Sequence, residues 1–155
     1  MLRNNYLYKN FEKMEKKGFL WWLVFVLSFI WQLPQNIVAI VMMPFLGKLK
    51  LIKVDNYCFA FSGTGMAGGI SLGNFIFLSE YMGKIDRYVA HEMGHVVDSH
   101  IWGPFYLIII GIPSILNAAF NFTDCYYDFY TERWANKHAG LGVNEYCRTY
   151  FLDRE

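Results

Sequence analysis

Two long stretches without charge constrain this chain more than any other feature of its sequence. Residues 19–47 and residues 101–123 contain no Asp, Glu, Lys or Arg. Hydrophobic residues make up 55% of the 155 residues and charged residues 17%, whereas about a quarter of the residues are charged in a typical soluble domain. Two such stretches in so short a chain predict a membrane protein, and a disordered chain is excluded.

The first stretch is too long for one straight membrane helix and is interrupted near its centre. Residues 19–46 would extend about 42 Å as a helix, against a hydrocarbon core of about 30 Å. Pro34 lies in the middle, beside Gln32 and Gln35. Because proline kinks or breaks a helix interior, we expect a kinked segment or a helix–break–helix hairpin.

Basic residues on both sides of this segment predict its orientation. Residues 1–18 form a basic N-terminal segment, and Lys48, Lys50 and Lys53 follow the hydrophobic segment directly. Since lysine and arginine are enriched on the cytoplasmic side of membranes, we expect a cytoplasmic N-terminus and an integral protein of the cytoplasmic (inner) membrane. The lipid bilayer is then a predicted partner.

Residues 51–79 change to the alternation that is typical of strands. Large apolar side chains alternate with small or polar ones over residues 57–62 and again over residues 70–79, and the glycine-rich run between them predicts the turn of one β-hairpin. Residues 63–68 match the GxGxxG pattern, but a dinucleotide site needs those glycines to open a helix, and a strand pattern follows instead. Neither a nucleotide nor, at a net charge of +1, a nucleic acid is a predicted partner.

Three helices are expected in the second half of the chain. They cover residues 85–102, an apolar segment at residues 103–120, and a more polar segment at residues 124–140 that is ended by Gly140 and Gly142. The predicted fold is a single membrane-embedded domain that is mainly α-helical with a small β-hairpin.

The first of these helices carries the motif HExxH, as His91-Glu92-Met93-Gly94-His95. Residues four apart lie on one face of a helix, so the two imidazoles can bind one Zn²⁺. Glu92 then lies beside the metal, where it can accept a proton from a bound water. The alternative is a helix with two buried, hydrogen-bonded histidines and no metal.

A catalytic zinc site usually has a third protein ligand. His100 lies about 180° around the helix from His91. Asp98 is closer to the correct face but would have to bend back from the same helix. Glu132 is the better candidate, because it lies on the third expected helix among apolar neighbours.

The two motifs together resemble those of membrane gluzincins, namely the HtpX heat-shock protease and the type I CAAX prenyl endopeptidase. The first motif typically reads HExGH in these families, as it does here with Gly94. The second motif, ExxAD, corresponds to Glu132-Arg-Trp-Ala135-Asn136. The resemblance covers roughly residues 70–140 and implies a zincin-like pair of active-site helices.

The resemblance also implies the role of each residue. His91, His95 and Glu132 are the zinc ligands by this resemblance, and Glu92 is the general base. Asn136 occupies the position of the family's Asp, which supports a ligand histidine from outside the metal shell. Asn can accept a hydrogen bond but brings no charge, so Asp98 and Asp128 are candidates for a supporting carboxylate.

Two further features of the site remain open in the sequence. By the same resemblance, residues 73–79 are expected to form an edge strand that binds extended substrate. Tyr130, Arg133 and His138 are candidates to stabilise an oxyanion, and the sequence does not choose among them.

These observations predict a membrane-embedded, zinc-dependent metalloendopeptidase that hydrolyses peptide bonds of membrane-associated polypeptides. The alternative is a non-catalytic membrane protein, either a pseudo-protease or a partner subunit, in which HExxH is a structural metal site or fortuitous. Replacing Glu92 by Gln distinguishes the two, because it removes the base and leaves the metal ligands in place.

Overall fold

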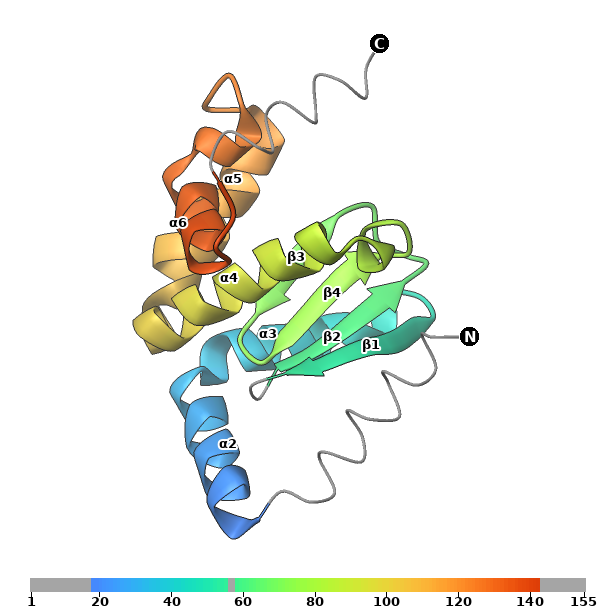
Figure 1. The fold of residues 1–155 in the computed structure, drawn as a ribbon, viewed down its shortest axis with the longest axis vertical. Coiled ribbons are helices and arrows are strands. Elements are labelled where there is room, and N and C mark those ends of the chain that lie inside the picture. The colour runs from blue at the N-terminus through green and yellow to red at the C-terminus, as the bar shows by residue number, and fades with distance from the viewer. Residues whose placement is uncertain (1–17, 56–57, 143–155) are drawn as a thin grey trace.

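A computed structural model of the chain describes residues 18–55 and 58–142 (Figure 1). Two helices come first, then four strands, then three more helices. Their bounds are α2 (Phe19–Trp31), α3 (Leu33–Met42), β1 (Leu49–Asp55), β2 (Cys58–Gly63), β3 (Gly69–Leu72), β4 (Phe75–Ser79), α4 (Asp86–Trp102), α5 (Ile112–Phe120) and α6 (Tyr130–His138). The described part of the chain is thus an α/β structure.

The strands form one four-stranded mixed sheet in the order β1-β2-β4-β3. β1 pairs with β2 and β3 pairs with β4 in antiparallel fashion, whereas β2 and β4 are parallel. The prediction of a single hairpin is therefore wrong. Residues 70–79 are not one strand, because Gly73 and Asn74 form a two-residue turn between β3 and β4. Gly73 adopts φ +63°, a backbone conformation that glycine accepts without strain.

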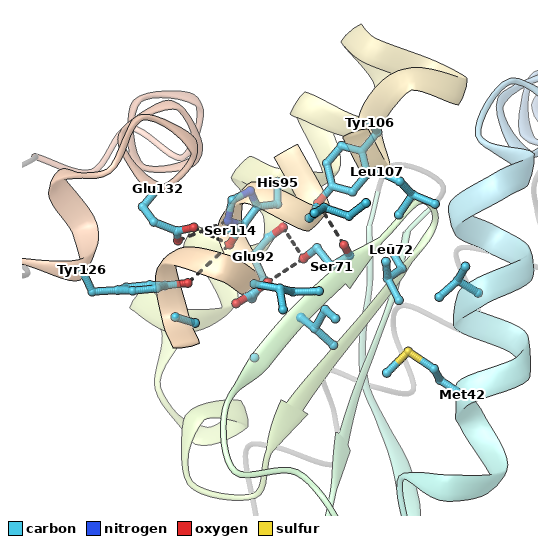
Figure 2. Close-up of a pocket in the computed structure, with 17 residues that line it drawn as sticks. Met42, Ser71, Leu72, Glu92, His95, Tyr106, Leu107, Ser114, Tyr126 and Glu132 are labelled. Carbon is cyan, nitrogen blue, oxygen red and sulfur yellow. Dashed lines mark hydrogen bonds and ion pairs between the residues drawn. The ribbon is translucent and has the colours of Figure 1, made fainter. Parts of the chain in front are cut away.

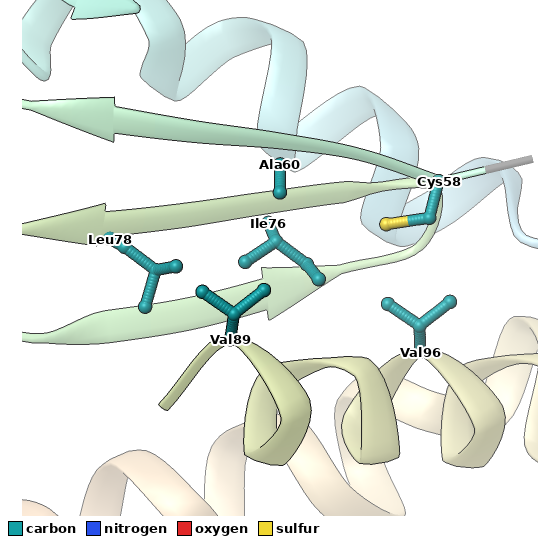
Figure 3. Close-up of a cluster of buried hydrophobic side chains, with 6 residues drawn as sticks. All are labelled: Cys58, Ala60, Ile76, Leu78, Val89 and Val96. Atoms are coloured by element: carbon teal, nitrogen blue, oxygen red, sulfur yellow. The ribbon is translucent and has the colours of Figure 1, made fainter. Parts of the chain in front are cut away.

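Helices cover both faces of the sheet (Figure 1). On one face, Cys58, Ala60, Ile76 and Leu78 pack against Val89 and Val96 of α4 (Figure 3). On the other face, Phe77 and Leu72 pack with Ala39 of α3 and with Leu46. Because successive side chains of a strand point to opposite faces, the apolar run of β4 serves both cores at once.

The predicted fold class, a mainly α-helical membrane protein, is wrong. The central element is the mixed sheet, and its strands account for the apolar residues between the two uncharged stretches. Among the described residues, no single helix is both long enough and apolar enough to cross a bilayer. The segments Phe19–Trp31 and Leu33–Phe45 reach that length and composition only as a pair, and they are bent by 87° relative to each other.

The bend between α2 and α3 is attached to the rest of the fold by buried amides. Gln35 Nε2 donates hydrogen bonds to Ser99 Oγ and to the Gly103 carbonyl, each at 2.9 Å. Asn36 Nδ2 donates to Asn74 Oδ1 at 2.9 Å, and the backbone N–H of Asn74 donates to Asn36 Oδ1 at 2.8 Å. The polar residues around Pro34 therefore attach this bend to α4 and to the β3–β4 turn, so the bend is held by specific contacts.

The second uncharged stretch is not one regular helix. A π-helix at Leu107–Gly111 precedes α5. Pro113 has no N–H to offer the carbonyl of Ile109, four residues before it. The Tyr130 hydroxyl donates a hydrogen bond to that carbonyl at 2.5 Å instead. This contact joins the π-helix to α6, the helix that carries Glu132.

Candidate metal centre

α4 supplies two histidines and a glutamate to a buried site. His91, Glu92 and His95 are 4%, 5% and 5% exposed, although each carries an ionisable group. The four-residue spacing places both imidazoles on the face of α4 that looks away from the sheet core, toward α6. Burial of this kind is rare for such residues unless they are paired or bind a metal.

α6 supplies the third residue, because it packs closely on α4. Gly94 lies at the contact, and a Cβ there would overlap the backbone carbonyl of Ala135. Without a side chain at Gly94, the two backbones come close enough for Glu132, which is fully buried, to reach both histidines. The glycine of the first motif is thus explained by helix packing.

The three predicted ligands converge on one point. Glu132 Oε2 lies 3.1 Å from His91 Nε2 and 3.4 Å from His95 Nε2. One donor atom from each of the three residues lies within 4.8 Å of the other two. Two imidazole nitrogens and a carboxylate oxygen, all buried, form a group that could hold a metal ion.

Contacts at the far side of each imidazole fix the rings. His91 Nδ1 donates to Asn136 Oδ1 at 2.8 Å, which is the contact that the resemblance to gluzincins implies for Asn136. His95 Nδ1 lies 3.4 Å from Asp98 Oδ2, and the other oxygen of Asp98 lies 2.9 Å from His138 Nδ1. Asp98 therefore lies beside His95 and not beside His91, at ion-pair distance and without a hydrogen bond to the ring.

Hydroxyl groups hold the second oxygen of Glu132. Ser114 Oγ donates a hydrogen bond to Glu132 Oε1 at 2.5 Å, and Thr131 Oγ1 donates to the same oxygen at 3.0 Å. Tyr126 lies next in line, with its hydroxyl 3.4 Å from Ser114 Oγ. These donors orient the carboxylate so that Oε2 alone faces the histidines.

The buried charges perturb one another in the metal-free site. Burial would raise the pKa of Glu132, but hydrogen bonds from His91 and His95 outweigh it and hold that pKa far below its usual range. Burial would lower the pKa of His95, but its contacts with Asp98 and Glu132 raise the pKa to about 10. Without metal, a proton on His95 therefore balances the Glu132 carboxylate.

Glu92 lies against the edge of the sheet. The Ser71 hydroxyl contacts Glu92 Oε2 at 2.7 Å and the Glu92 carbonyl at 2.9 Å. Gly69, two residues earlier on β3, leaves room for the other oxygen, because a Cβ there would overlap Glu92 Oε1. β3 therefore fixes the orientation of the carboxylate that the sequence predicted as general base.

A cavity of about 380 Å³ opens beside these residues (Figure 2). Glu92, His95, Glu132 and Tyr126 form its polar wall. The apolar part of the lining comes from three places: Val38 and Met42 of α3, Ile70 and Leu72 of β3, and Leu107, Ile112, Ile115 and Ala118 of the segment around α5. The space can accept an apolar side chain next to the metal ligands.

The predictions that went beyond the motif need correction. β4 (Phe75–Ser79) lies inside the sheet between β2 and β3, so the expected edge strand at residues 73–79 is wrong and β3 takes that place. Of the oxyanion candidates, Tyr130 bonds to Ile109, His138 lies against Asp98, and Arg133 is exposed. None of the three lines the cavity, whereas Tyr126 does.

No family model matches the sequence, and comparisons with curated proteins and with solved structures find no match either. The resemblance to membrane gluzincins therefore rests on the two motifs alone and stays a prediction. What the fold adds is the spatial meeting of those motifs in one buried group.

Several residues of the site give no signal in the sequence. Ser71, Ser114 and Tyr126 belong to no motif. Ser71 is 21 residues from Glu92 and Ser114 is 18 residues from Glu132 in the sequence, and only the fold brings these pairs into contact. A serine that alternates with apolar residues on a strand indicates which face of the strand is polar, and this was the only available sign for Ser71.

Proposed function

We propose that this protein is a zinc-dependent metalloendopeptidase that cleaves polypeptides held at a membrane. The observation that carries the proposal is the buried group of His91, His95 and Glu132, of which His95 and Glu132 line a cavity together with Glu92. Two histidines and a glutamate are a donor set of catalytic zinc sites, which leave one position open for water. This donor set suits zinc better than calcium or magnesium, because those two ions prefer ligand sets that consist of oxygen only.

The residues around the cavity have separate tasks in hydrolysis. A bound zinc ion lowers the pKa of water and polarises a carbonyl. Glu92 accepts the proton of the attacking water and passes it to the leaving amine. Ser71 holds one oxygen of that carboxylate, which leaves the other for the water. Tyr126, whose burial keeps its pKa above the usual range, stays a neutral donor that can reach a developing oxyanion.

The membrane part of the proposal is supported by the apolar surface of the described residues. Phe19, Leu20, Leu27 and Ile30 of α2 are each more than half exposed, and so are Ile112, Ile115 and Phe120 of α5. No charged residue interrupts residues 19–47, and Lys48 and Lys50 follow as exposed cations. An apolar surface bordered by lysines fits the cytoplasmic face of an anionic bilayer.

Zinc content and peptide cleavage test the proposal together. Wild-type protein purified in detergent should bind about one zinc per chain. Glu132→Ala should lose most of it. Glu92→Gln should keep the zinc and lose cleavage of a peptide library by at least about a hundredfold, since general base catalysis contributes that much or more. Glu80→Gln, an exposed glutamate before α4, is the matched control and should behave as wild type.

A non-catalytic metal protein is the second candidate, because the same three ligands also join α4 to α6. Under that reading, zinc raises the melting temperature, and the Glu92→Gln and wild-type proteins are indistinguishable in every assay. Well-folded wild type that takes up no zinc when zinc is supplied would overturn both candidates.

A further inference from the structure

β3 is an edge strand whose free side borders the cavity. Its only strand neighbour among the described residues is β4. The Ser79 amide donates to the Gly68 carbonyl at 2.8 Å, and the pairs Ile70–Phe77 and Leu72–Phe75 continue this register. Because backbone groups of an antiparallel strand alternate between its two sides, those of Gly69 and Ser71 point away from β4. These are the groups that an added peptide strand would meet.

One of these groups is already occupied. The Tyr106 hydroxyl donates a hydrogen bond to the Ser71 carbonyl at 2.9 Å (Figure 2). Tyr106 is 2% exposed and comes just before the π-helix, whose residue Leu107 lines the same cavity. Burial and the nearby Glu92 carboxylate raise the pKa of Tyr106 well above its usual value, so the phenol remains a donor.

We propose that Tyr106 is a specificity-determining residue that ends backbone pairing between β3 and a peptide substrate at Ser71. The inference rests on the proposed peptidase function and adds which side of the substrate the enzyme reads. A peptide next to β3 can accept a hydrogen bond from the Gly69 N–H and donate one to the Gly69 carbonyl. It can also accept a hydrogen bond from the Ser71 N–H. It cannot donate to the Ser71 carbonyl while Tyr106 holds it.

The direction of the substrate follows from strand geometry. Antiparallel pairs are the more stable per residue, so a bound peptide runs opposite to β3. The peptide residue opposite Ser71 then lies two residues closer to the peptide's N-terminus than the residue opposite Gly69. Tyr106 therefore removes one hydrogen bond on the N-terminal side of the bound segment. Recognition beyond that point falls to the apolar wall of the cavity.

Backbone methylation of the substrate tests the inference. A peptide that the wild type cleaves is prepared as a series in which each amide nitrogen is methylated in turn, which removes one donor at a time. In Tyr106→Leu, which withdraws the phenol from the carbonyl, one additional amide on the N-terminal side should become sensitive to methylation. The unmethylated peptide should show a KM lower by roughly three- to tenfold, with kcat unchanged.

Tyr130→Leu is the matched control, because it also removes a phenol that donates to a backbone carbonyl, that of Ile109, outside the cavity. It should keep the methylation pattern of the wild type. Tyr106→Met serves as a second variant if Tyr106→Leu is poorly folded by its melting curve. The wild-type scan is informative without any variant, since it should show no sensitive amide opposite the Ser71 carbonyl.

The outcomes separate this inference from the function on which it rests. Cleavage by the wild type with the same methylation pattern in Tyr106→Leu would overturn the role of Tyr106 and leave the peptidase function standing. A wild type that binds zinc but cleaves no peptide would overturn the peptidase function and this inference with it. An amide whose methylation slows cleavage by Tyr106→Leu, but not by the wild type or Tyr130→Leu, would support both the role of Tyr106 and the peptidase function.

Discussion

At the scale of single residues, the site divides its supporting contacts unevenly between the two histidines. The neutral side-chain amide of Asn136 accepts a hydrogen bond from His91, whereas the buried carboxylate of Asp98 lies 3.4 Å from His95 Nδ1. A carboxylate on the outer nitrogen makes an imidazole a more basic ligand. Among the described residues, the one buried carboxylate beside a candidate ligand on its outer side is thus next to His95, whereas His91 has a neutral amide there.

The pKa of His95 predicts how the metal-free protein responds to pH. Its value in the folded state, about 10, lies above the ordinary value of 6.5. The folded state therefore holds a proton that the unfolded chain has lost between these values, so stability is full below pH 6.5 and falls as the pH rises toward 10. The slope contributed by His95 should be about 1.4 kcal/mol per pH unit.

Urea unfolding of chelator-treated protein across this pH range measures the slope. His95→Gln should remove it, whereas His100→Gln, on the same helix but hydrogen-bonded to Ser28 and Val96, should retain it. A free energy of unfolding that stays level or increases in the wild type over this range would contradict the prediction.

The residues of the metal group and the neighbouring Asn136 could be named from the sequence, whereas Ser71, Ser114 and Tyr106 could not. His91, Glu92 and His95 share one helix, so their spacing alone places them together. Ser71 and Tyr106 reach the site because β3 is an edge strand, and this depends on strand order. No local pattern encodes strand order, since β2 and β4 are parallel neighbours that are separated by β3 in the sequence.

At the scale of elements, the contact between α4 and α6 decides whether the site exists. Gly94 should not tolerate a side chain, because a Cβ would overlap the Ala135 backbone and move α6 away. Gly94→Ala should lower the free energy of unfolding by about 1–3 kcal/mol, although alanine is the better helix former. It should also weaken zinc binding, since Glu132 moves with α6.

Urea unfolding and zinc titration of the Gly94→Ala protein check both effects. Gly68→Ala is the control, because a Cβ at Gly68 meets no atom within 4 Å. A Gly94→Ala protein as stable as the wild type, with the same zinc affinity, would show that the two helices adjust at no cost.

The element that the sequence described least well is the sheet. Gly73 and Asn74 fit the alternating pattern of residues 70–79, so the pattern continued through a turn. A glycine followed by an asparagine also suits a two-residue hairpin loop, and this competing signal was the correct one. In the same way, Gln35 was interpreted as part of a break in a membrane segment, whereas it is a buried residue that anchors the α2–α3 bend to α4.

At the scale of the whole molecule, part of the exposed apolar surface also lines the cavity. Val38 of α3 and Ile112 and Ile115 of α5 line the cavity and are also more than a third exposed. The cavity lining therefore reaches the apolar surface at these residues. If a bilayer covers this surface, substrate reaches the metal ligands from the lipid boundary, which joins the two parts of the proposed function.

The lipid contact predicts vesicle binding that depends on α2. Wild-type protein should float with vesicles that contain anionic lipid and less well with neutral ones, because Lys48 and Lys50 border the apolar surface. Leu27→Glu combined with Ile30→Glu should weaken binding tenfold or more, since each change replaces an exposed apolar side chain by a charge. Tyr81→Glu, at a 65% exposed residue between β4 and α4, is the control.

Self-association is the competing use of the same surface, and the same variants separate it from lipid binding. The wild type would then bind neither kind of vesicle and would form dimers without lipid, and Leu27→Glu with Ile30→Glu would dissociate them. That result would make a second copy of the chain, and not the bilayer, the partner of this surface. Equal flotation of the double variant and the wild type would remove α2 from the contact. Flotation lost in the double variant and kept in Tyr81→Glu would place α2 at the lipid, because a charge added outside α2 then leaves binding intact.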